Sequence, residues 1–324
     1  MKFIANQNRY DKMIYNRCGN SGLKLPALSL GLYQNFNEYD NYTECKNMIL
    51  KSFDLGITHL DLANNYGIPT GYTEELVGRI LNNELLRYRD ELIITSKAGY
   101  DMWEGPYGEW GSKKYMIASL NQSLKKLKLD YVDIFYSHRF DPETPLEETM
   151  CALDLIVRQG KALYVGISNY DVENSKKAFD ILRQLGTPCL VHQPSYSIYN
   201  RWIEDGLLDL LKSEGVGSVV FQALQRGALS SLYLNGIPAE KIDFLAQRGI
   251  TEQLISKSIK LNEIAKQRGQ SLSQMAIAWT LRNKNVTSVI FGARNSEQIV
   301  DNVQALNNLQ FSDEELIKID QIVY

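Results

Sequence analysis

Four polar side chains stand at or just after the ends of expected β-strands, where acid–base chemistry can be carried out. Asp61 lies near the end of the segment THLDLA, and Tyr66 follows in the loop NNYG. Lys97 ends ELIITSK, and His138 ends YVDIFYSH. A buried Asp and a buried Lys are expected to pair, because unpaired burial of either is costly. A phenol beside that ammonium is expected to have a lowered pKa, which suits a general acid for a carbonyl oxygen.

Strand alternation gives three of these side chains a common direction. If the faces that carry Asp61, Lys97 and His138 point inward, the three converge beside Tyr66, and His138 can donate to the same oxygen. Taken singly, each residue has an ordinary structural role: a loop cap, a solvated charge, a structural histidine or a packing aromatic. The combination favours a reactive site.

Short apolar segments rich in β-branched and aromatic residues alternate with segments of helical periodicity. We expect eight strands, at 28–33, 58–63, 91–97, 131–138, 162–168, 189–195, 217–223 and 287–293. We expect helices near 43–55, 73–84, 112–129, 145–160, 172–185, 205–214, 251–268 and 271–283. Ser112 is placed to cap the third of these helices.

Eight strand–helix units predict an α/β fold, a parallel sheet closed into a (β/α)8 TIM barrel. A doubly wound open sheet is the competing arrangement. Residues 13–27 read as an N-terminal hairpin around Gly-Asn-Ser-Gly that closes the bottom of the barrel, and additional C-terminal helices follow. No linker divides the chain, so we expect residues 1–324 to form a single domain.

Composition excludes several classes of protein. The chain has 324 residues and a formal net charge of −3, which argues against a general nucleic-acid binder. No apolar run is long enough to span a membrane, so membrane insertion is not expected. The N-terminus lacks a signal peptide and the four cysteines form no Cys-x-x-Cys pair, so we expect a reducing, cytoplasmic location. The three histidines show no metal-ligand spacing, and neither a Rossmann nor a P-loop glycine motif is present.

The segments DLANNYG, ITSKAGYDMW and YVDIFYSH resemble the catalytic segments of the aldo-keto reductase superfamily. GLKLPALSLGLY, GKALYVGISNY, HQPSYSIYNRW and VTSVIFGARNSEQIVDNVQALNNL extend the resemblance over nearly the whole chain. The nearest branch resembles the bacterial L-glyceraldehyde-3-phosphate reductases and the potassium-channel β-subunits. The resemblance implies a (β/α)8 barrel that binds NADPH or NADP+ without a Rossmann domain and reduces small carbonyl compounds, such as glyceraldehyde 3-phosphate or methylglyoxal. A homo-oligomer is compatible with it.

The resemblance also implies roles for matching residues. Tyr66 would protonate the carbonyl oxygen, Lys97 anchored by Asp61 would tune Tyr66, and His138 would orient the carbonyl. Residues matching the cofactor site are Ser168, Asn169, Gln193, Phe221, Gln222, Leu224, Gly292, Arg294, Gln298, Asp301 and Asn302. Residues expected around the substrate are Tyr33, Trp103 and Arg139, with Arg139 a candidate for a substrate phosphate. The aromatic loop that holds Tyr100, Trp103, Tyr107 and Trp110 is expected to wall the pocket or simply to pack on itself.

One segment departs from the family pattern. Where the family commonly has Ser/Thr-Pro-Leu ending in Gly-Lys-Tyr, this chain reads FQALQRGALSSLY, with Gln222 and Ala223 in place of the hydroxyl–proline pair and Leu232 in place of a lysine. The grip on the cofactor pyrophosphate is therefore in question, with Arg226 or Lys241 as possible substitutes.

Two other classes of function stay open. A cofactor-binding regulatory subunit with slow turnover would fit the departure in this segment, although the four polar residues are intact. An aldolase-like enzyme with Lys97 as a Schiff-base lysine would need a low lysine pKa, which Asp61 opposes.

Overall fold

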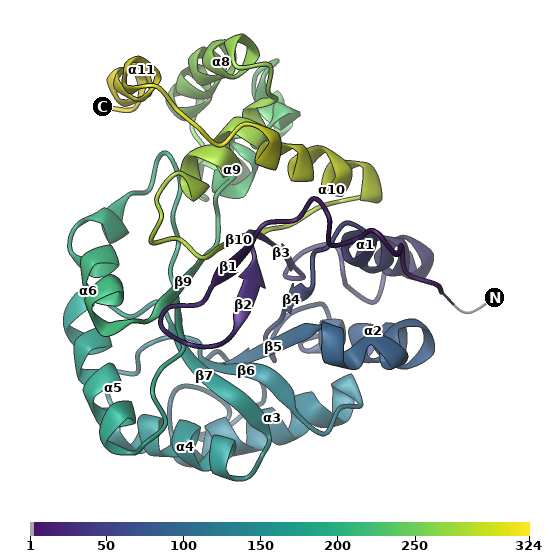
Figure 1. Cartoon of the computed structure of the whole chain (residues 1–324), viewed down its shortest axis with the longest axis vertical. Helices are drawn as coiled ribbons and strands as arrows, with labels where there is room; N and C mark the ends of the chain where they lie inside the picture. Colours follow the sequence, from purple (N-terminus) through teal and green to yellow (C-terminus); the bar gives the residue numbers. More distant parts are fainter. Residues whose placement is uncertain (1–2) are drawn as a thin grey trace.

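A closed ring of eight parallel strands stands at the centre of the molecule, in a computed structural model that describes residues 3–324 (Figure 1). The strands neighbour one another in the order β10-β3-β4-β5-β6-β7-β8-β9. Their bounds are β3 Leu28–Gly31, β4 His59–Asp61, β5 Ile93–Ala98, β6 Val132–Ser137, β7 Ala162–Ser168, β8 Val191–Gln193, β9 Gly217–Val220 and β10 Ser288–Phe291. The predicted (β/α)8 barrel is confirmed, because the last strand pairs with the first and no open edge remains.

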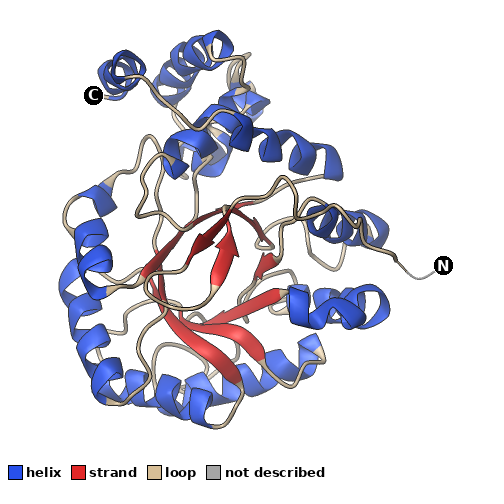
Figure 2. Cartoon of the chain, in the orientation of Figure 1, coloured by secondary structure: helices blue, strands red, loops and turns tan. Residues whose placement is uncertain are grey.

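Helices surround this ring (Figure 2). They are α1 Tyr42–Asp54, α2 Tyr72–Ile80, α3 Lys113–Leu127, α4 Leu146–Arg158, α5 Val172–Gln184, α6 Leu207–Glu214, α7 Ile242–Ala246, α8 Glu252–Gln267, α9 Leu272–Leu281, α10 Ser296–Val303 and α11 Asp313–Val323. The expected cap of α3 is present, since the Ser112 hydroxyl accepts from the Tyr115 N–H at 3.2 Å. The additional C-terminal helices are also present, with α8 and α11 packed together outside the ring (Figure 1).

The N-terminal hairpin forms as expected, from β1 (Tyr15–Arg17) and β2 (Lys24–Pro26) paired antiparallel. Cys18 and Leu25 of this hairpin are fully buried and pack against barrel-lining residues that include Ile134, Tyr136 and Val191. The hairpin therefore closes the end of the barrel at which the strands begin.

Several strands are shorter than the sequence predicts. Strand β9 ends at Val220, Phe221 still pairs with Ser195 in an isolated bridge, and Gln222 then adopts a left-handed backbone with φ of 63°. The segment 189–195 stops at Gln193 because Pro194 has no N–H for the sheet. His138 likewise lies just beyond β6. Because the strands end at these residues, polar side chains lie at the carboxyl end of the barrel, where the active sites of barrel enzymes are found.

No helix within residues 3–324 is both long enough and apolar enough to cross a membrane.

Candidate active site

A buried ion pair joins two neighbouring strands at the carboxyl end of the barrel. Lys97 of β5 is fully buried and donates to Asp61 Oδ2 of β4 at 2.7 Å. The same ammonium donates to the Leu62 carbonyl at 2.7 Å and to the Tyr66 hydroxyl at 3.4 Å. Each hydrogen of the ammonium thus has an oxygen partner, which compensates for its burial. The expected pairing of Asp61 with Lys97 is confirmed.

The loop after β4 holds Tyr66 against this pair. The Tyr66 carbonyl accepts from the N–H groups of Gly71 and Thr73, at 3.1 and 3.2 Å, at the start of α2. Gly67 has φ of 93°, and a Cβ there would lie 2.7 Å from the Thr73 nitrogen, so only glycine fits this turn. The turn fixes where the phenol points.

Burial raises the pKa of the Tyr66 phenol well above its ordinary value, and the nearby Asp61 carboxylate raises it further. The sequence predicts the opposite direction, from the Lys97 ammonium alone, and that prediction is wrong. Loss of solvent around the phenol outweighs an ammonium that stands 3.4 Å away. Tyr66 therefore keeps its proton at neutral pH.

His138 stands beside the phenol as a neutral imidazole. Burial lowers the pKa of His138 well below its ordinary value, and the cations of Lys97 and Arg139 lower it further. Its ring lies 6.0 Å from the Tyr66 ring and 4.7 Å from the Tyr100 ring, both edge to face. Its Nδ1 has no hydrogen-bond partner among the described residues. The structure thus brings all four residues of the predicted site together.

Three predicted cofactor residues form one network at the ends of β7 and β8. Ser168 Oγ donates to the Gln193 carbonyl at 2.8 Å, and Asn169 Nδ2 donates to the His138 carbonyl at 3.1 Å. Gln193 Nε2 donates to Asp61 Oδ1 at 2.9 Å. This last contact connects the predicted cofactor site to the ion pair.

The segment after β9 has an unusual backbone. Gln222, Gln225 and Arg226 all have positive φ, between 45° and 63°. Phe221 is half-buried and packs against the cluster that fills the barrel, and Leu224 is half-buried too. The Arg226 guanidinium is exposed and donates to the Arg248 carbonyl at 2.9 Å, so it already fastens this segment to the loop before α8.

The other predicted cofactor residues lie in α10 and in the loop between β10 and α10. Arg294 is exposed and precedes the cap residue Asn295, while Gly292 is an exposed residue just after β10. The Gln298 side-chain oxygen accepts from the Arg294 N–H at 2.8 Å. Two further predicted cofactor residues differ in their surroundings. Asp301 accepts a hydrogen bond from Gln274 Nε2 at 2.7 Å, and Asn302 is buried. Both therefore contact the protein interior or a neighbouring helix.

Aromatic residues surround the phenol and the imidazole. Tyr33 is 63% exposed, and its ring meets the Tyr66 ring edge to face at 5.0 Å. Trp103 packs on Tyr115, with ring centroids 5.3 Å apart.

The Arg139 guanidinium lies between two rings, 4.2 Å from the Tyr100 centroid and 3.6 Å from the Trp110 centroid. It donates to the Gly99 carbonyl at 2.8 Å and pairs with Glu109. A substrate phosphate at Arg139 stays a prediction, and such a phosphate would have to share the cation with Glu109.

Sequence reasoning missed two supports of the ion pair. Thr95 Oγ1 donates to Asp61 Oδ1 at 3.1 Å, and Gln193 donates to the same oxygen. The strand alternation of β5, which points Thr95 and Lys97 to one side, was the available signal for Thr95. No local signal indicates the contact of Gln193, because 132 residues separate it from Asp61.

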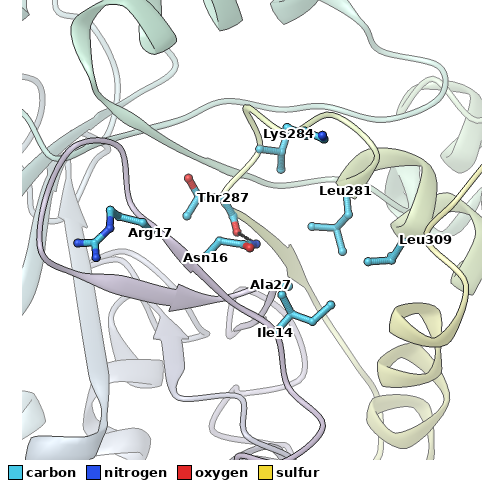
Figure 3. A pocket seen from close by; sticks show the side chains of 9 residues that line it. Ile14, Asn16, Arg17, Ala27, Leu281, Lys284, Thr287 and Leu309 are labelled. Carbon is cyan, nitrogen blue, oxygen red and sulfur yellow. Dashed lines mark hydrogen bonds between the residues drawn. The ribbon is translucent and has the colours of Figure 1, made fainter.

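A separate hollow of about 320 Å³ lies at the opposite end of the barrel, where the strands begin. It is lined by residues of the hairpin, of the loop before β10 and of the segment before α11, and Figure 3 shows Arg17 and Lys284 at its edges. Asn16 donates across it to the Thr287 carbonyl at 2.9 Å. Nothing in the described residues shows what covers this hollow.

Within residues 3–324 no group of three or more His, Cys, Asp or Glu side chains is placed to hold a metal ion.

The (β/α)8 barrel with Asp61, Tyr66, Lys97 and His138 gathered at its carboxyl end is the arrangement that the sequence resemblance implied. The sequence model of the Aldo/keto reductase family matches residues 27–324, and the chain belongs to that family. The chain is 53% identical to the L-glyceraldehyde 3-phosphate reductase of Escherichia coli (strain K12), over 99% of this chain and 95% of the relative. It is 33% identical to a protein of Oryza sativa subsp. japonica named "Probable voltage-gated potassium channel subunit beta", over 96% of this chain and 97% of the relative. A protein of Arabidopsis thaliana with the same name is also 33% identical, over 96% of this chain and 97% of the relative.

Proposed function

We propose that this protein is an NADPH-dependent reductase of small aldehydes, with glyceraldehyde 3-phosphate or methylglyoxal as the class of substrate. The observation that carries the proposal is the Lys97 ammonium, which donates to both Asp61 and the Tyr66 hydroxyl beside a neutral His138. The 53% identity to an L-glyceraldehyde 3-phosphate reductase supports the choice of substrate.

Tyr66 is the proton donor of the proposed reaction. Because burial raises the pKa of its phenol, the hydroxyl is protonated at neutral pH and has a proton to give. As that proton moves to the carbonyl oxygen, negative charge develops on the phenolic oxygen, and the Lys97 ammonium 3.4 Å away stabilises it. Asp61 keeps Lys97 in place, and His138 donates a hydrogen bond that orients the carbonyl group.

The strand-end network fits the carboxamide of a nicotinamide. Asn169 and Gln193 use their side-chain N–H groups on protein oxygens. Their side-chain carbonyl oxygens are then left to accept from a carboxamide, and the Ser168 hydroxyl beside them can accept as well. Asn169 is held in a left-handed backbone conformation, with φ of 57°, that turns it toward this site. Ser168, Asn169 and Gln193 would hold a nicotinamide there, and its chemistry would be the supply of a hydride to the carbonyl carbon.

The adenosine end of the cofactor is assigned to α10. Arg294 is an exposed guanidinium at the start of a helix, where a 2′-phosphate would meet its charge and the N-terminal dipole of α10. Arg226 and Lys241 are exposed cations of the segment after β9 and are the candidates for the pyrophosphate.

Replacing Tyr66 tests the proposal. In Tyr66→Phe the ring remains and the proton donor is lost, so kcat for the reduction of methylglyoxal should fall by at least about 100-fold. The Kd for NADPH, measured by quenching of protein fluorescence, should stay within about twofold of the parent value, because the phenol makes no part of the assigned cofactor site.

Tyr324→Phe, at the exposed C-terminal residue, is the matched control and should behave as the parent protein. Retention of most of kcat in Tyr66→Phe would rule out the assigned acid. If the parent protein binds NADPH but consumes it no faster than Tyr66→Phe with any aldehyde, a regulatory cofactor-binding subunit is favoured instead.

We also propose a cytoplasmic location. Cys18, Cys45, Cys151 and Cys189 are all free thiols, and three of them are buried. Persistent free thiols are typical of a reducing compartment.

A further inference from the structure

The first turn of α2 is connected to both partners of the Lys97–Tyr66 contact. Thr73 donates its N–H to the Tyr66 carbonyl at 3.2 Å. The next residue, Glu74, accepts a hydrogen bond at 2.6 Å from the hydroxyl of Ser96, the residue that precedes Lys97 in β5. Two consecutive residues of one helix therefore hold the loop of the phenol and the strand of the ammonium.

Glu74 is an unusual residue for its place. Its side chain is fully buried between α2, α3 and the outer face of β5. Ser96 Oγ is the donor to Oε1, and Ser123 Oγ of α3 lies 3.5 Å from Ser96 Oγ. Oε2 has no hydrogen-bond partner among the described residues. An apolar side chain would fill this space at lower cost, so packing alone does not account for a carboxylate here.

The charge of Glu74 faces the catalytic lysine across one strand. Ser96 points to the outside of the barrel and Lys97 to the inside, so Glu74 lies behind β5 and Asp61 lies in front of it. Lys126 of α3 is the other cation near Glu74. The remaining titratable groups around the ammonium come from β4, from β6 and the residue after it, and from the loop after β4. They are Asp61, His59, Tyr66, Tyr136 and His138.

We propose that Glu74 is a positioning residue of the active site: its buried carboxylate holds Lys97 in the ammonium form and, through Ser96, in line with Tyr66. The inference rests on the proposed reductase function for its catalytic meaning. Its electrostatic part concerns Lys97 alone and can be tested without turnover.

The balance of charges agrees with this role. Burial lowers the pKa of Lys97. The Asp61 carboxylate opposes this shift most strongly, and the Glu74 carboxylate opposes it as well. Burial raises the pKa of Glu74, and the hydroxyls of Ser96 and Ser123 and the two lysines oppose that rise. Each buried ion thus favours the charged form of the other.

The test is a pH titration of Lys97 that is monitored by NMR. The protein is labelled with ¹³C at lysine Cε, and the signal of Lys97 is assigned by its loss in Lys97→Met. Glu74→Gln keeps an oxygen that can accept from Ser96 and removes only the charge. The midpoint of the Lys97 titration should move to lower pH by at least about half a unit. The basic limb of the kcat profile for methylglyoxal reduction should move in the same direction.

Glu75→Gln is the matched control, because it removes the same charge one residue further along α2 at an exposed position. Its Lys97 midpoint should equal that of the parent. If Glu74→Gln lowers the melting temperature but leaves the midpoint unchanged, Glu74 serves packing only and the proposal is wrong.

Ser96→Ala covers the case in which Glu74→Gln does not fold. It keeps the charge of Glu74 and removes the hydroxyl through which the carboxylate holds β5, so kcat for methylglyoxal reduction should fall while the Lys97 midpoint stays near that of the parent. An unchanged kcat in Ser96→Ala, measured beside an active parent protein, would then overturn the positioning through Ser96. A shifted midpoint in a protein with no reductase activity would instead contradict only the proposed function.

Discussion

Lys97, Tyr66 and His138 show how burial sets protonation at the scale of single residues. The ammonium is kept by three oxygens, the phenol keeps its proton, and the imidazole stays neutral. The site therefore has one fixed cation and one available proton at neutral pH. This is the state that reduction of a carbonyl group requires from the protein.

Arg294 allows a prediction at the same scale. If its guanidinium binds a 2′-phosphate, Arg294→Ala should raise KM for NADPH by about 10-fold or more, which is what loss of a charge-assisted contact costs. KM for NADH, which lacks that phosphate, should change little. Steady-state kinetics with both cofactors at one ionic strength give the ratio.

Lys284→Ala, at the opposite end of the barrel, is the control for a simple change of net charge. Equal losses for the two cofactors in Arg294→Ala would remove the assignment of α10 to the 2′-phosphate.

At the scale of elements, the N-terminal hairpin closes the barrel and the strand ends open into the site. Leu25 of β2 has no exposed surface, whereas Lys24 beside it is exposed. The Leu25 side chain therefore lies on the core side of the ribbon, and Pro26, the last residue of β2, is buried as well. The hairpin thus contributes to stability at the end of the barrel opposite the site.

Truncating Leu25 tests that contribution. Leu25→Ala removes a side chain from a closed apolar cluster and should lower the free energy of unfolding by about 2–5 kcal/mol. Urea unfolding followed by circular dichroism measures the change, with Lys24→Ala as the control. An unchanged midpoint in Leu25→Ala would mean that the hairpin is not part of the cooperative core.

At the scale of the whole molecule, the three histidines are all buried and neutral. Burial lowers the pKa of His59 and of His192 to about 4. Between pH 6.5 and 4 the unfolded chain therefore binds protons that the folded chain does not, so stability is lost as the pH falls through that window. Below pH 4 the folded state also takes up these protons, and the histidine contribution to the pH dependence levels off.

His192→Gln isolates one share of this acid sensitivity. His192 Nε2 lies 3.1 Å from the Tyr170 carbonyl, and a glutamine amide can donate to the same oxygen. The parent protein should lose roughly 3 kcal/mol more than the variant between pH 7 and pH 4, the value that corresponds to its lowered pKa. Urea unfolding at pH 7, 5.5 and 4 measures the two slopes, and parallel slopes would show that His192 is not buried neutral.

The sequence by itself determined the barrel, the order of its elements and the four polar residues at its carboxyl end. Those features follow from local rules, since periodicity, caps such as Ser112 and the alternation of a strand are properties of neighbouring residues. Only the tertiary structure decided the direction of the Tyr66 pKa shift, the contact of Gln193 with Asp61 and the burial of Glu74 behind Lys97. Loss of solvent around a group and contacts between distant segments depend on every element packed around it. No window of the sequence contains that information.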